Sequence, residues 1–270
     1  MLVRREWVFL ALLLSAPITG ATGNVITDWD AKAVGIVQTG TAPPPPLGFR
    51  TMAILHSAMF DAVNSIEPRY KPYKVRLAAT PDTSKEAAAA AAAAAVLIKL
   101  FPDAAADVQS TLTTYLTTLP DGEAKSKGVM LGQEVATKIL EARDKDGAAA
   151  ADAYRPKTKP GAYIPTPITY GWALATMTPF ALASPSQFRA KPPPSLKSAE
   201  WARDYNEIKN LGAKNSTTRT PRQSEDARFW LVGGPLAYDQ LPRQIVIAKN
   251  MDLLDSARFM ALFQSRLRTR

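Results

Sequence analysis

The run of nine consecutive alanines at residues 87–95 most constrains the fold of this chain. Alanine has the highest helix propensity of the amino acids, and the run leads directly into the apolar residues 96–98. We therefore expect a helix here, and its small side chains would let a second helix approach closely. Thr83, with Glu86 three residues later, predicts a capping box at the start of this helix.

Most of the other helices are predicted from apolar residues at three- and four-residue spacing. In residues 49–66, Met52, Leu55, Met59 and Val63 form such a buried stripe. Prolines between the segments end one helix before the next begins. The further helices are expected at residues 28–38, 103–118, 123–146, 195–211 and 241–264.

One more helix start is marked by its capping residues. Thr220 can cap the first turn, Pro221 fits the first helical position, and Gln223 would close a capping box. We expect this helix to carry Phe229 and Trp230 inward.

The connections between the helices are rich in proline. Residues 43–46 predict a stiff polyproline turn. Residues 154–194 hold many of the 22 prolines, with Trp172 and Phe180 between them, and predict an ordered extended loop that wraps over the helices. Convincing alternation of apolar and polar residues is lacking, so the predicted fold is all-α, a helical bundle with proline-rich extended connectors.

The first residues have the pattern of a secretory signal. Arg4 and Arg5 precede a short apolar run at residues 7–14, and Ala21 suits a cleavage site. The run is far shorter than the roughly 20 residues that span a bilayer, and no later stretch is apolar enough. We expect a signal peptide at residues 1–23, a secreted or periplasmic protein, and no membrane span in the mature chain.

The net charge of +9 would be typical of a nucleic-acid-binding protein if it were clustered. Five of the basic residues lie at the two ends, and without them the body carries +4, dispersed among acidic residues. Such a distribution is typical of an ordinary solvated surface. We therefore expect no nucleic-acid partner. The five terminal residues are Arg4, Arg5, Arg266, Arg268 and Arg270.

The chain has one histidine, His56, and no cysteine. Thiol nucleophiles, disulfides and the usual zinc sites are excluded, and a Ser-His-Asp triad could be built only on His56. Because His56 lies on an apolar helix, we interpret it as a core residue bonded to a carbonyl or carboxylate, in preference to a proton carrier. We assign no catalytic, cofactor-binding or metal-binding residue.

Acidic residues offer weak alternatives. Asp61 and Asn64 could bind an ion, but capping or buried hydrogen bonding is the preferred interpretation. Asp28 and Asp30 could pair as acid and base, but a spacing of two separates them on a helix and favours capping. Asp144 and Asp146 before Gly147 weakly resemble a calcium loop that no glutamate closes.

Two further features could bind an anion. Residues 233–235, Gly-Gly-Pro, are interpreted as a turn, because a phosphate loop also needs a lysine. Arg155, Arg189, Arg219 and Arg222 are dispersed over separate loops and are expected to make surface ion pairs instead of an anion patch.

Several segments, in order, resemble one family. Residues 24–30 read Asn-Val-Ile-Thr-Asp-Trp-Asp, residues 50–66 contain Leu-His-Ser-Ala-Met-Phe-Asp-Ala-Val-Asn, and residues 178–194 contain Pro-Phe-Ala-Leu-Ala-Ser-Pro-Ser-Gln-Phe-Arg. Asn206-Glu207-Ile208-Lys209, Arg219-Thr220 and Ala227-Arg228-Phe229-Trp230 continue the series. Together they resemble the N-terminal half of bacterial vanadium-dependent haloperoxidases, in the type-2 phosphatidic acid phosphatase superfamily, over most of residues 24–264.

The resemblance implies a helical bundle that holds vanadate as a phosphate mimic and oxidises halide with peroxide. In the family, the oxyanion is held by a lysine with an arginine seven positions later, by Pro-Ser-Gly-His, and by a second arginine with a histidine after it. Here no lysine has an arginine seven residues later, and Ser-Gly-His and a second histidine are absent. No vanadate ligand can be assigned.

We therefore expect residues 24–264 to be the N-terminal helical scaffold of a haloperoxidase-like protein, truncated before its anion site and inactive as this chain. The family pattern stops at Ser265, so residues 265–270 are interpreted as an aberrant basic tail. Two alternatives stay open: an acid phosphatase-related protein of the same superfamily, and a non-catalytic helical binding protein of the envelope. Exposed apolar helix faces would permit a homo-oligomer.

Overall fold

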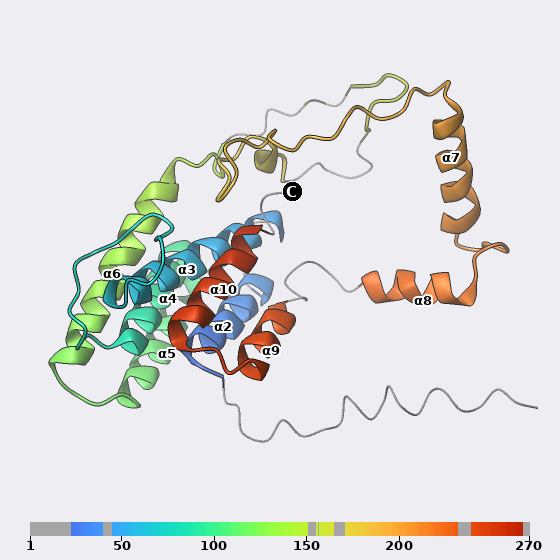
Figure 1. Cartoon of the computed structure of the whole chain (residues 1–270). Coiled ribbons are helices and arrows are strands. Elements are labelled where there is room, and N and C mark those ends of the chain that lie inside the picture. The colour runs from blue at the N-terminus through green and yellow to red at the C-terminus, as the bar shows by residue number, and fades with distance from the viewer. Residues whose placement is uncertain are drawn as a thin grey trace, which may run out of the picture.

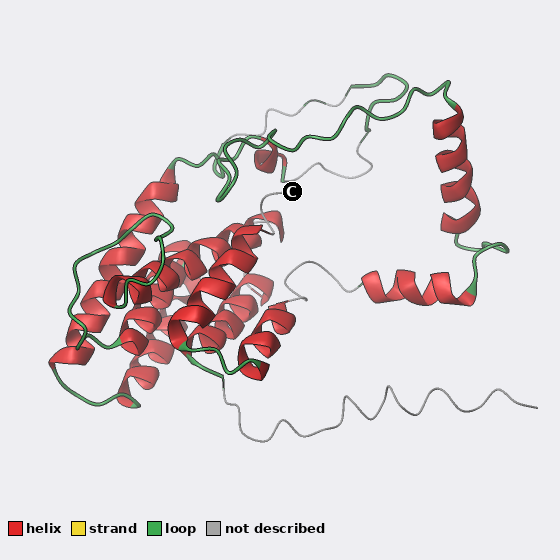
Figure 2. Ribbon diagram, viewed as in Figure 1, coloured by secondary structure: helices red, strands yellow, loops and turns green. Residues whose placement is uncertain are grey.

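The computed structural model describes residues 23–39, 45–150, 155, 157–164, 171–231 and 239–266, and all regular secondary structure within them is helical (Figure 2). The expected all-α fold is confirmed. Residues 1–22 of the predicted signal peptide and residues 267–270 of the predicted tail lie outside the described residues. The α-helices are α2 (Val25–Thr39), α3 (Pro45–Ile66), α4 (Lys85–Leu100), α5 (Ala105–Thr117), α6 (Glu123–Asp144), α7 (Ala199–Gly212), α8 (Pro221–Trp230), α9 (Gln240–Ala248) and α10 (Leu253–Arg266).

Helix α3 forms the centre of a helical bundle and contacts α2, α4, α6 and α10 (Figure 1). The predicted stripe of Met52, Leu55, Met59 and Val63 is fully buried. Among the described residues, no helix combines the length and the apolar composition that crossing a bilayer requires.

The alanine run forms α4, and residues 87–94 are all buried in the bundle. The predicted cap is wrong by one residue. Ser84, not Thr83, caps the helix and accepts a hydrogen bond from the Ala87 backbone N–H at 3.1 Å. Thr83 belongs to the preceding turn, because its backbone N–H donates to the Thr80 carbonyl.

Helix α6 packs lengthwise against α4 with small residues at the contact. Gly128 and Gly132, one turn apart, bring the α6 backbone against the backbone of α4. The expected close approach of a second helix to the alanines is therefore confirmed, and it buries the apolar face of α6.

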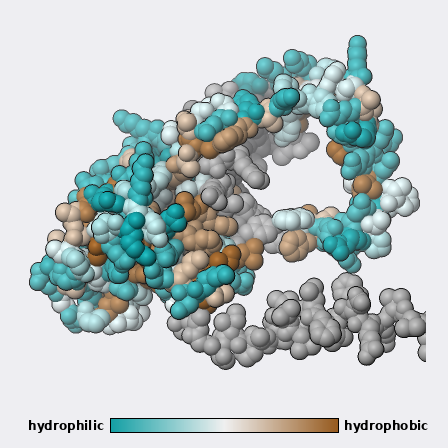
Figure 3. Space-filling model, in the orientation of Figure 1, coloured by the Kyte–Doolittle hydropathy of each residue, from teal (hydrophilic) through white to brown (hydrophobic). Residues whose placement is uncertain are grey.

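Beyond Phe180, the chain runs away from the bundle toward α7 and α8 (Figure 1). Met177 and Phe180 are buried against it, but α7 and α8 contain no buried residue and stand away from the other helices (Figure 1). The predicted loop at 154–194 is thus anchored to the bundle near its middle, and part of it lies outside the described residues. Figure 3 shows apolar residues at the surface of both the bundle and the segment that contains α7 and α8.

The capping box of Thr220 and Gln223 is confirmed at the start of α8. The inward orientation of Phe229 and Trp230 is wrong, since their exposed fractions are 63% and 68%. The two rings pack edge to face on each other, with centroids 5.2 Å apart, because no bundle surface covers α8.

The predicted helix at 241–264 is also wrong, because it is broken into α9 and α10. Asn250 has a φ of 46°, a left-handed conformation that asparagine tolerates better than most residues. Asp252 then caps α10 by accepting from the Asp255 backbone N–H at 2.7 Å. Helix α10 continues through Arg266, so the first two residues of the predicted tail are helical.

Candidate functional site

A charged cluster lies buried where α2, α3 and α9 meet. The His56 side chain is fully buried, and its Nε2 lies 2.8 Å from Oδ1 of Asp30, which is also fully buried. Oδ2 of Asp30 accepts a second hydrogen bond from Nη1 of Arg243 at 2.7 Å. Because Asp30 accepts both bonds, we place the imidazole proton on Nε2.

A second carboxylate, Asp239, extends this cluster toward α10. Its Oδ1 accepts a hydrogen bond from Nε2 of Gln264 at 3.0 Å, while its Oδ2 has no partner among the described residues. Burial, reinforced by the negative charge of Asp30, raises the pKa of Asp239 to about 6, although Gln264, His56 and Arg243 act in the opposite direction.

The sequence places Asp30 in the core because it shares a helix face with apolar residues. Ile26 lies four residues before it and Ala33 three residues after it, and both are fully buried. This position was the signal for a buried Asp30, and the expectation that Asp30 is a cap is wrong. Asp28, two residues earlier, is exposed in the first turn of α2. The histidine expectation is confirmed, because His56 is a core residue bonded to a carboxylate.

Arg243, Asp239 and Gln264 were not singled out from the sequence. They lie more than 180 residues after His56, and only the return of α9 and α10 to the bundle brings them together. The spacing of residues along the chain contains no information about such a contact.

The arrangement of His56 and Asp30 has two of the three parts of a hydrolytic triad. In the described structure, Nδ1 of His56 has no hydrogen-bond partner, and the neighbouring Ser57 hydroxyl has none either, so no nucleophile is activated. The imidazole is also 0% exposed, and a general base must reach its substrate. This geometry orients the helices and does not suit catalysis.

Vanadate, which the resemblance implies, does not fit this cluster. A multiply charged oxyanion needs several uncommitted cationic donors. Here Arg243 and His56 already donate to Asp30, and the unpaired oxygen beside them belongs to the carboxylate of Asp239. Two buried carboxyl groups would repel the oxyanion.

A second buried cluster joins α3, α6 and the proline-rich connector. Oδ2 of Asp146 lies 2.8 Å from Nε of Arg50 and 2.7 Å from Nη2 of Arg143. Arg143 also donates to the carbonyls of Thr178 and Pro179 and lies over the ring of Phe180, with its guanidinium carbon 3.9 Å from the centroid.

These contacts give Asp146 a structural role, since two guanidinium groups hold its carboxylate. In the described part of the chain, no three histidine, aspartate or glutamate side chains gather in an arrangement that would hold a metal ion. The arginine donors are already used, so this cluster does not fit an oxyanion either.

Asp61 and Asn64 make the buried hydrogen bonds expected of them. Asp61 accepts from the backbone N–H groups of Tyr73, Lys74 and Val75 at 2.7 to 2.9 Å. Burial raises the pKa of Asp61, and these hydrogen bonds oppose the shift. Asn64 donates to the carbonyl of Tyr70 and accepts from its N–H.

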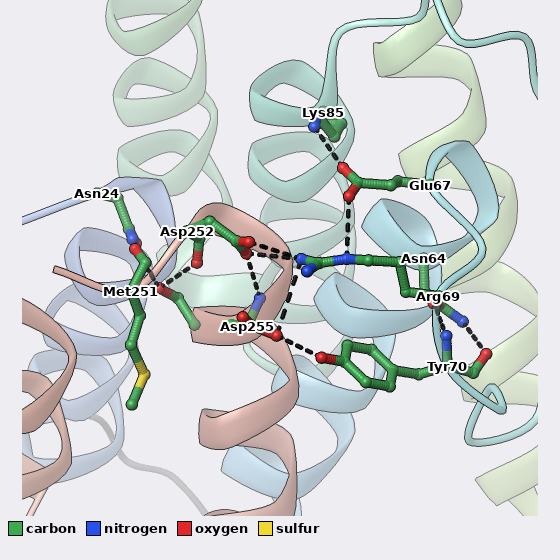
Figure 4. Close-up of polar contacts among 10 residues, drawn as sticks. Asn24, Asn64, Glu67, Arg69, Tyr70, Lys85, Met251, Asp252 and Asp255 are labelled. Atoms are coloured by element: carbon green, nitrogen blue, oxygen red, sulfur yellow. Dashed lines mark hydrogen bonds and ion pairs between the residues drawn. The ribbon is translucent and has the colours of Figure 1, made fainter. Parts of the chain in front are cut away.

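A surface network ties the segment after α3 to the start of α10 (Figure 4). The guanidinium of Arg69 bonds both oxygens of Asp252, at 2.8 and 2.7 Å, and also pairs with Glu67 at 2.9 Å. The Tyr70 hydroxyl donates to Asp255 at 2.6 Å. The network fixes the turn that carries residues 69–73 along one side of α10.

The surface ion pairs expected of the dispersed arginines are found for Arg222 but not for Arg219. Arg222 pairs with Asp226 at 3.4 Å, whereas Arg219 donates to the carbonyls of Leu211 and Ala213 and so closes the loop between α7 and α8. The Gly-Gly-Pro segment at 233–235 lies outside the described residues.

No family model and no curated protein sequence matches this chain. Among solved structures, it is similar to the crystal structure of the first bacterial vanadium-dependent iodoperoxidase, with a TM-score of 0.68 and 18% sequence identity. The match covers 90% of this chain and 66% of the iodoperoxidase chain. The described helices therefore have a haloperoxidase-like fold, and this chain spans 66% of the length of the protein it resembles.

Proposed function

We propose that this chain is the helical scaffold of a vanadium-haloperoxidase-like protein of the type-2 phosphatidic acid phosphatase superfamily. The observation that carries the proposal is the shared helical arrangement over 90% of the chain. The ordered sequence segments at residues 24–30, 50–66 and 178–194 support it independently of the backbone. The reaction of the family would be the peroxide-dependent oxidation of a halide.

We further propose that these 270 residues do not hold vanadate or oxidise halide by themselves. The lysine-arginine pair, Ser-Gly-His and the second histidine of the family are absent from the sequence. His56, Arg243, Arg50 and Arg143 are each committed to buried carboxylates.

The experiment uses the purified chain with the iodoperoxidase as positive control. Equilibrium dialysis measures retained orthovanadate, and spectrophotometry measures triiodide formed from iodide and peroxide. We expect neither vanadate retention nor peroxide-dependent triiodide above the protein-free rate. Tight vanadate retention or iodide oxidation would contradict the proposed inactivity.

The family assignment has its own test in the coding DNA. Translation beyond the codon for Gln264 in all three frames should show a lysine, six residues, an arginine and then Pro-Ser-Gly-His. Absence of these ligands in every frame would count against the haloperoxidase assignment and leave the binding-protein alternative ahead.

Two alternative functions give different results. An acid phosphatase-related protein would hydrolyse p-nitrophenyl phosphate without peroxide. A non-catalytic helical binding protein of the envelope would show neither activity and would unfold cooperatively as a monomer. Export by the signal at residues 1–23, a secreted or periplasmic location and the lack of a nucleic-acid partner stay predictions.

Self-association is proposed from the exposed apolar face of α7. Trp201, Tyr205 and Ile208 repeat at four and three residues and share one helix face, and Ile208 is 72% exposed. An isolated helix of this length is marginal in water, so burying this face would stabilise it. We propose that a second copy of the chain covers it.

A further inference from the structure

A cleft of 310 Å³ opens between α3, the segment at residues 70–73 and the C-terminal part of α10. This volume lies at the lower end of the range of small-molecule sites, roughly 300 to 1,000 Å³. The buried charged cluster of His56 and Asp30 does not line it, so the cleft is a separate feature of the fold.

The walls of the cleft are aromatic and are held in place by other contacts. Phe60, Tyr70 and Tyr73 all line it. Tyr73 stacks on Phe180, with centroids 5.9 Å apart, and the Tyr70 hydroxyl is fixed by its bond to Asp255. Rings that are fixed before binding favour a flat apolar ligand body, because little conformational entropy is lost.

The rim of the cleft is cationic. Lys71 and Arg258 line it and are exposed to solvent, and Arg258 is positioned over the ring of Tyr70 at 4.5 Å. None of the described residues that line the cleft carries a carboxylate. An anionic group at the rim would therefore meet two cations, while the carboxylate of Asp255, which accepts from the Tyr70 hydroxyl, is not among the lining residues.

The inner side of the cleft offers a polar atom that lacks a partner. Ser57 lines the cleft, is 1% exposed, and its hydroxyl makes no hydrogen bond to any described residue. Leaving a buried hydroxyl unpaired is unfavourable, and a ligand group that hydrogen-bonds it would remove that cost.

We propose that this cleft binds a small hydroxylated aromatic carboxylate. Its ring would lie between the side chains of Phe60, Tyr70 and Tyr73, and its carboxylate would face Lys71 and Arg258 at the rim. A hydroxyl at the opposite end of the ring would pair with the Ser57 hydroxyl. The proposal involves binding only and does not depend on the haloperoxidase assignment.

The test measures binding of three probes to the full chain by ligand-observed NMR and isothermal titration calorimetry. We expect 4-hydroxybenzoate to bind most tightly. The neutral analogue 4-hydroxybenzamide lacks the carboxylate and should bind at least roughly tenfold more weakly. Benzoate should bind more weakly than 4-hydroxybenzoate. Equal affinity for the charged and neutral probes would overturn the proposal.

Variants locate the site. Leu262→Trp adds bulk to a residue that lines the cleft and should abolish binding, whereas the matched control Leu241→Trp changes an exposed leucine on α9 that does not line it. Ser57→Ala should reduce the preference for 4-hydroxybenzoate over benzoate. Arg258→Met should weaken the binding of both 4-hydroxybenzoate and benzoate. Wild-type melting temperatures for the tryptophan variants would show that folding is retained. Absence of binding to the wild-type chain, or binding that Leu262→Trp leaves unchanged, would disprove the assignment.

Discussion

Gly132 of α6 lies so close to Ala88 of α4 that a β-carbon built on the glycine would be 2.2 Å from the alanine carbonyl oxygen. It would also be 2.9 Å from the Ala92 backbone nitrogen. One turn earlier, a β-carbon on Gly128 would be 2.5 Å from the carbonyl oxygen of Ser84. The contact is therefore made by backbone atoms, which cannot rotate away as a side chain can.

The substitution Gly132→Ala should destabilise the protein although alanine is the better helix former. Overpacking of this kind costs about 1–3 kcal/mol. The gain in helix propensity is only ~1 kcal/mol. Because the added β-carbon would meet backbone atoms, which cannot rotate away, we expect a cost toward the upper end of the overpacking range. Urea unfolding followed by circular dichroism measures the difference. The control Gly35→Ala on α2 has no atom within 4 Å of the new β-carbon and should stabilise the protein slightly. Equal gains in both variants would refute the close contact.

The same contact shows what sequence alone can predict. The alanine run predicts a helix and a close partner from local propensity and side-chain size. It does not identify α6 as that partner, because Gly132 is more than 30 residues away and nothing in the spacing links the two segments. Likewise, the apolar repeat at 241–264 is continuous, and only the left-handed backbone at Asn250 reveals the break.

Asp30 should contribute much more to stability than Asp28. Asp30→Asn removes the charge that pairs Arg243 and His56 in the core, and breaking a buried pair in this way costs about 3 kcal/mol. Asp28→Asn changes an exposed carboxylate in the first turn of α2, where partial desolvation raises its pKa and opposes the favourable helix dipole, so the change in stability should stay within about 0.5 kcal/mol. Chemical unfolding of both variants at pH 7 is the measurement. A similar loss in the two would mean that the buried cluster is not a stabilising feature.

The buried cluster was only half predictable. The sequence indicated that His56 is a core residue with a carbonyl or carboxylate partner, because it lies on the apolar stripe of residues 49–66. The spacing of Asp30 from Asp28 alone favours a cap, and only the apolar residues Ile26 and Ala33 on the same helix face indicate that Asp30 is buried. Arg243 could not be predicted, since its contact depends on how α9 returns to α2.

Asp239 should make stability fall as the pH rises between about 4 and 6. Its pKa is about 6 in the folded protein and near the ordinary value of 3.8 in the unfolded chain, so the folded state binds the extra proton in this window. Ionising the buried group at pH 7 costs roughly 3 kcal/mol. Asp239→Asn should remove this pH dependence, so the variant should lose less stability than the wild-type chain between pH 4 and pH 7.

Melting temperatures at pH 4 to 7 check this effect. The control Asp121→Asn removes an exposed carboxylate that pairs with Lys125, and it should leave the fall between pH 4 and 6 in place. The interpretation is wrong if Asp239→Asn and the wild-type chain show parallel pH profiles.

The break between α9 and α10 should tolerate glycine and reject β-branched residues. Asn250→Gly should be neutral or slightly stabilising, because glycine adopts a φ of 46° without steric cost. Asn250→Val should cost about 1–2 kcal/mol, the usual penalty of a left-handed conformation. Thermal unfolding of the two variants measures the difference, and a valine variant as stable as the glycine variant would argue against a left-handed residue here.

The exposed face of α7 should mediate concentration-dependent self-association. Ile208→Glu places a charge on the apolar face formed with Trp201 and Tyr205, so it should shift the chain toward monomer in sedimentation velocity experiments. The control Asn206→Glu introduces the same residue on the opposite side of the helix and should sediment like the wild-type chain. A wild-type chain that remains monomeric at every concentration would rule out a second copy as the partner of this face, because association of two chains must increase with concentration.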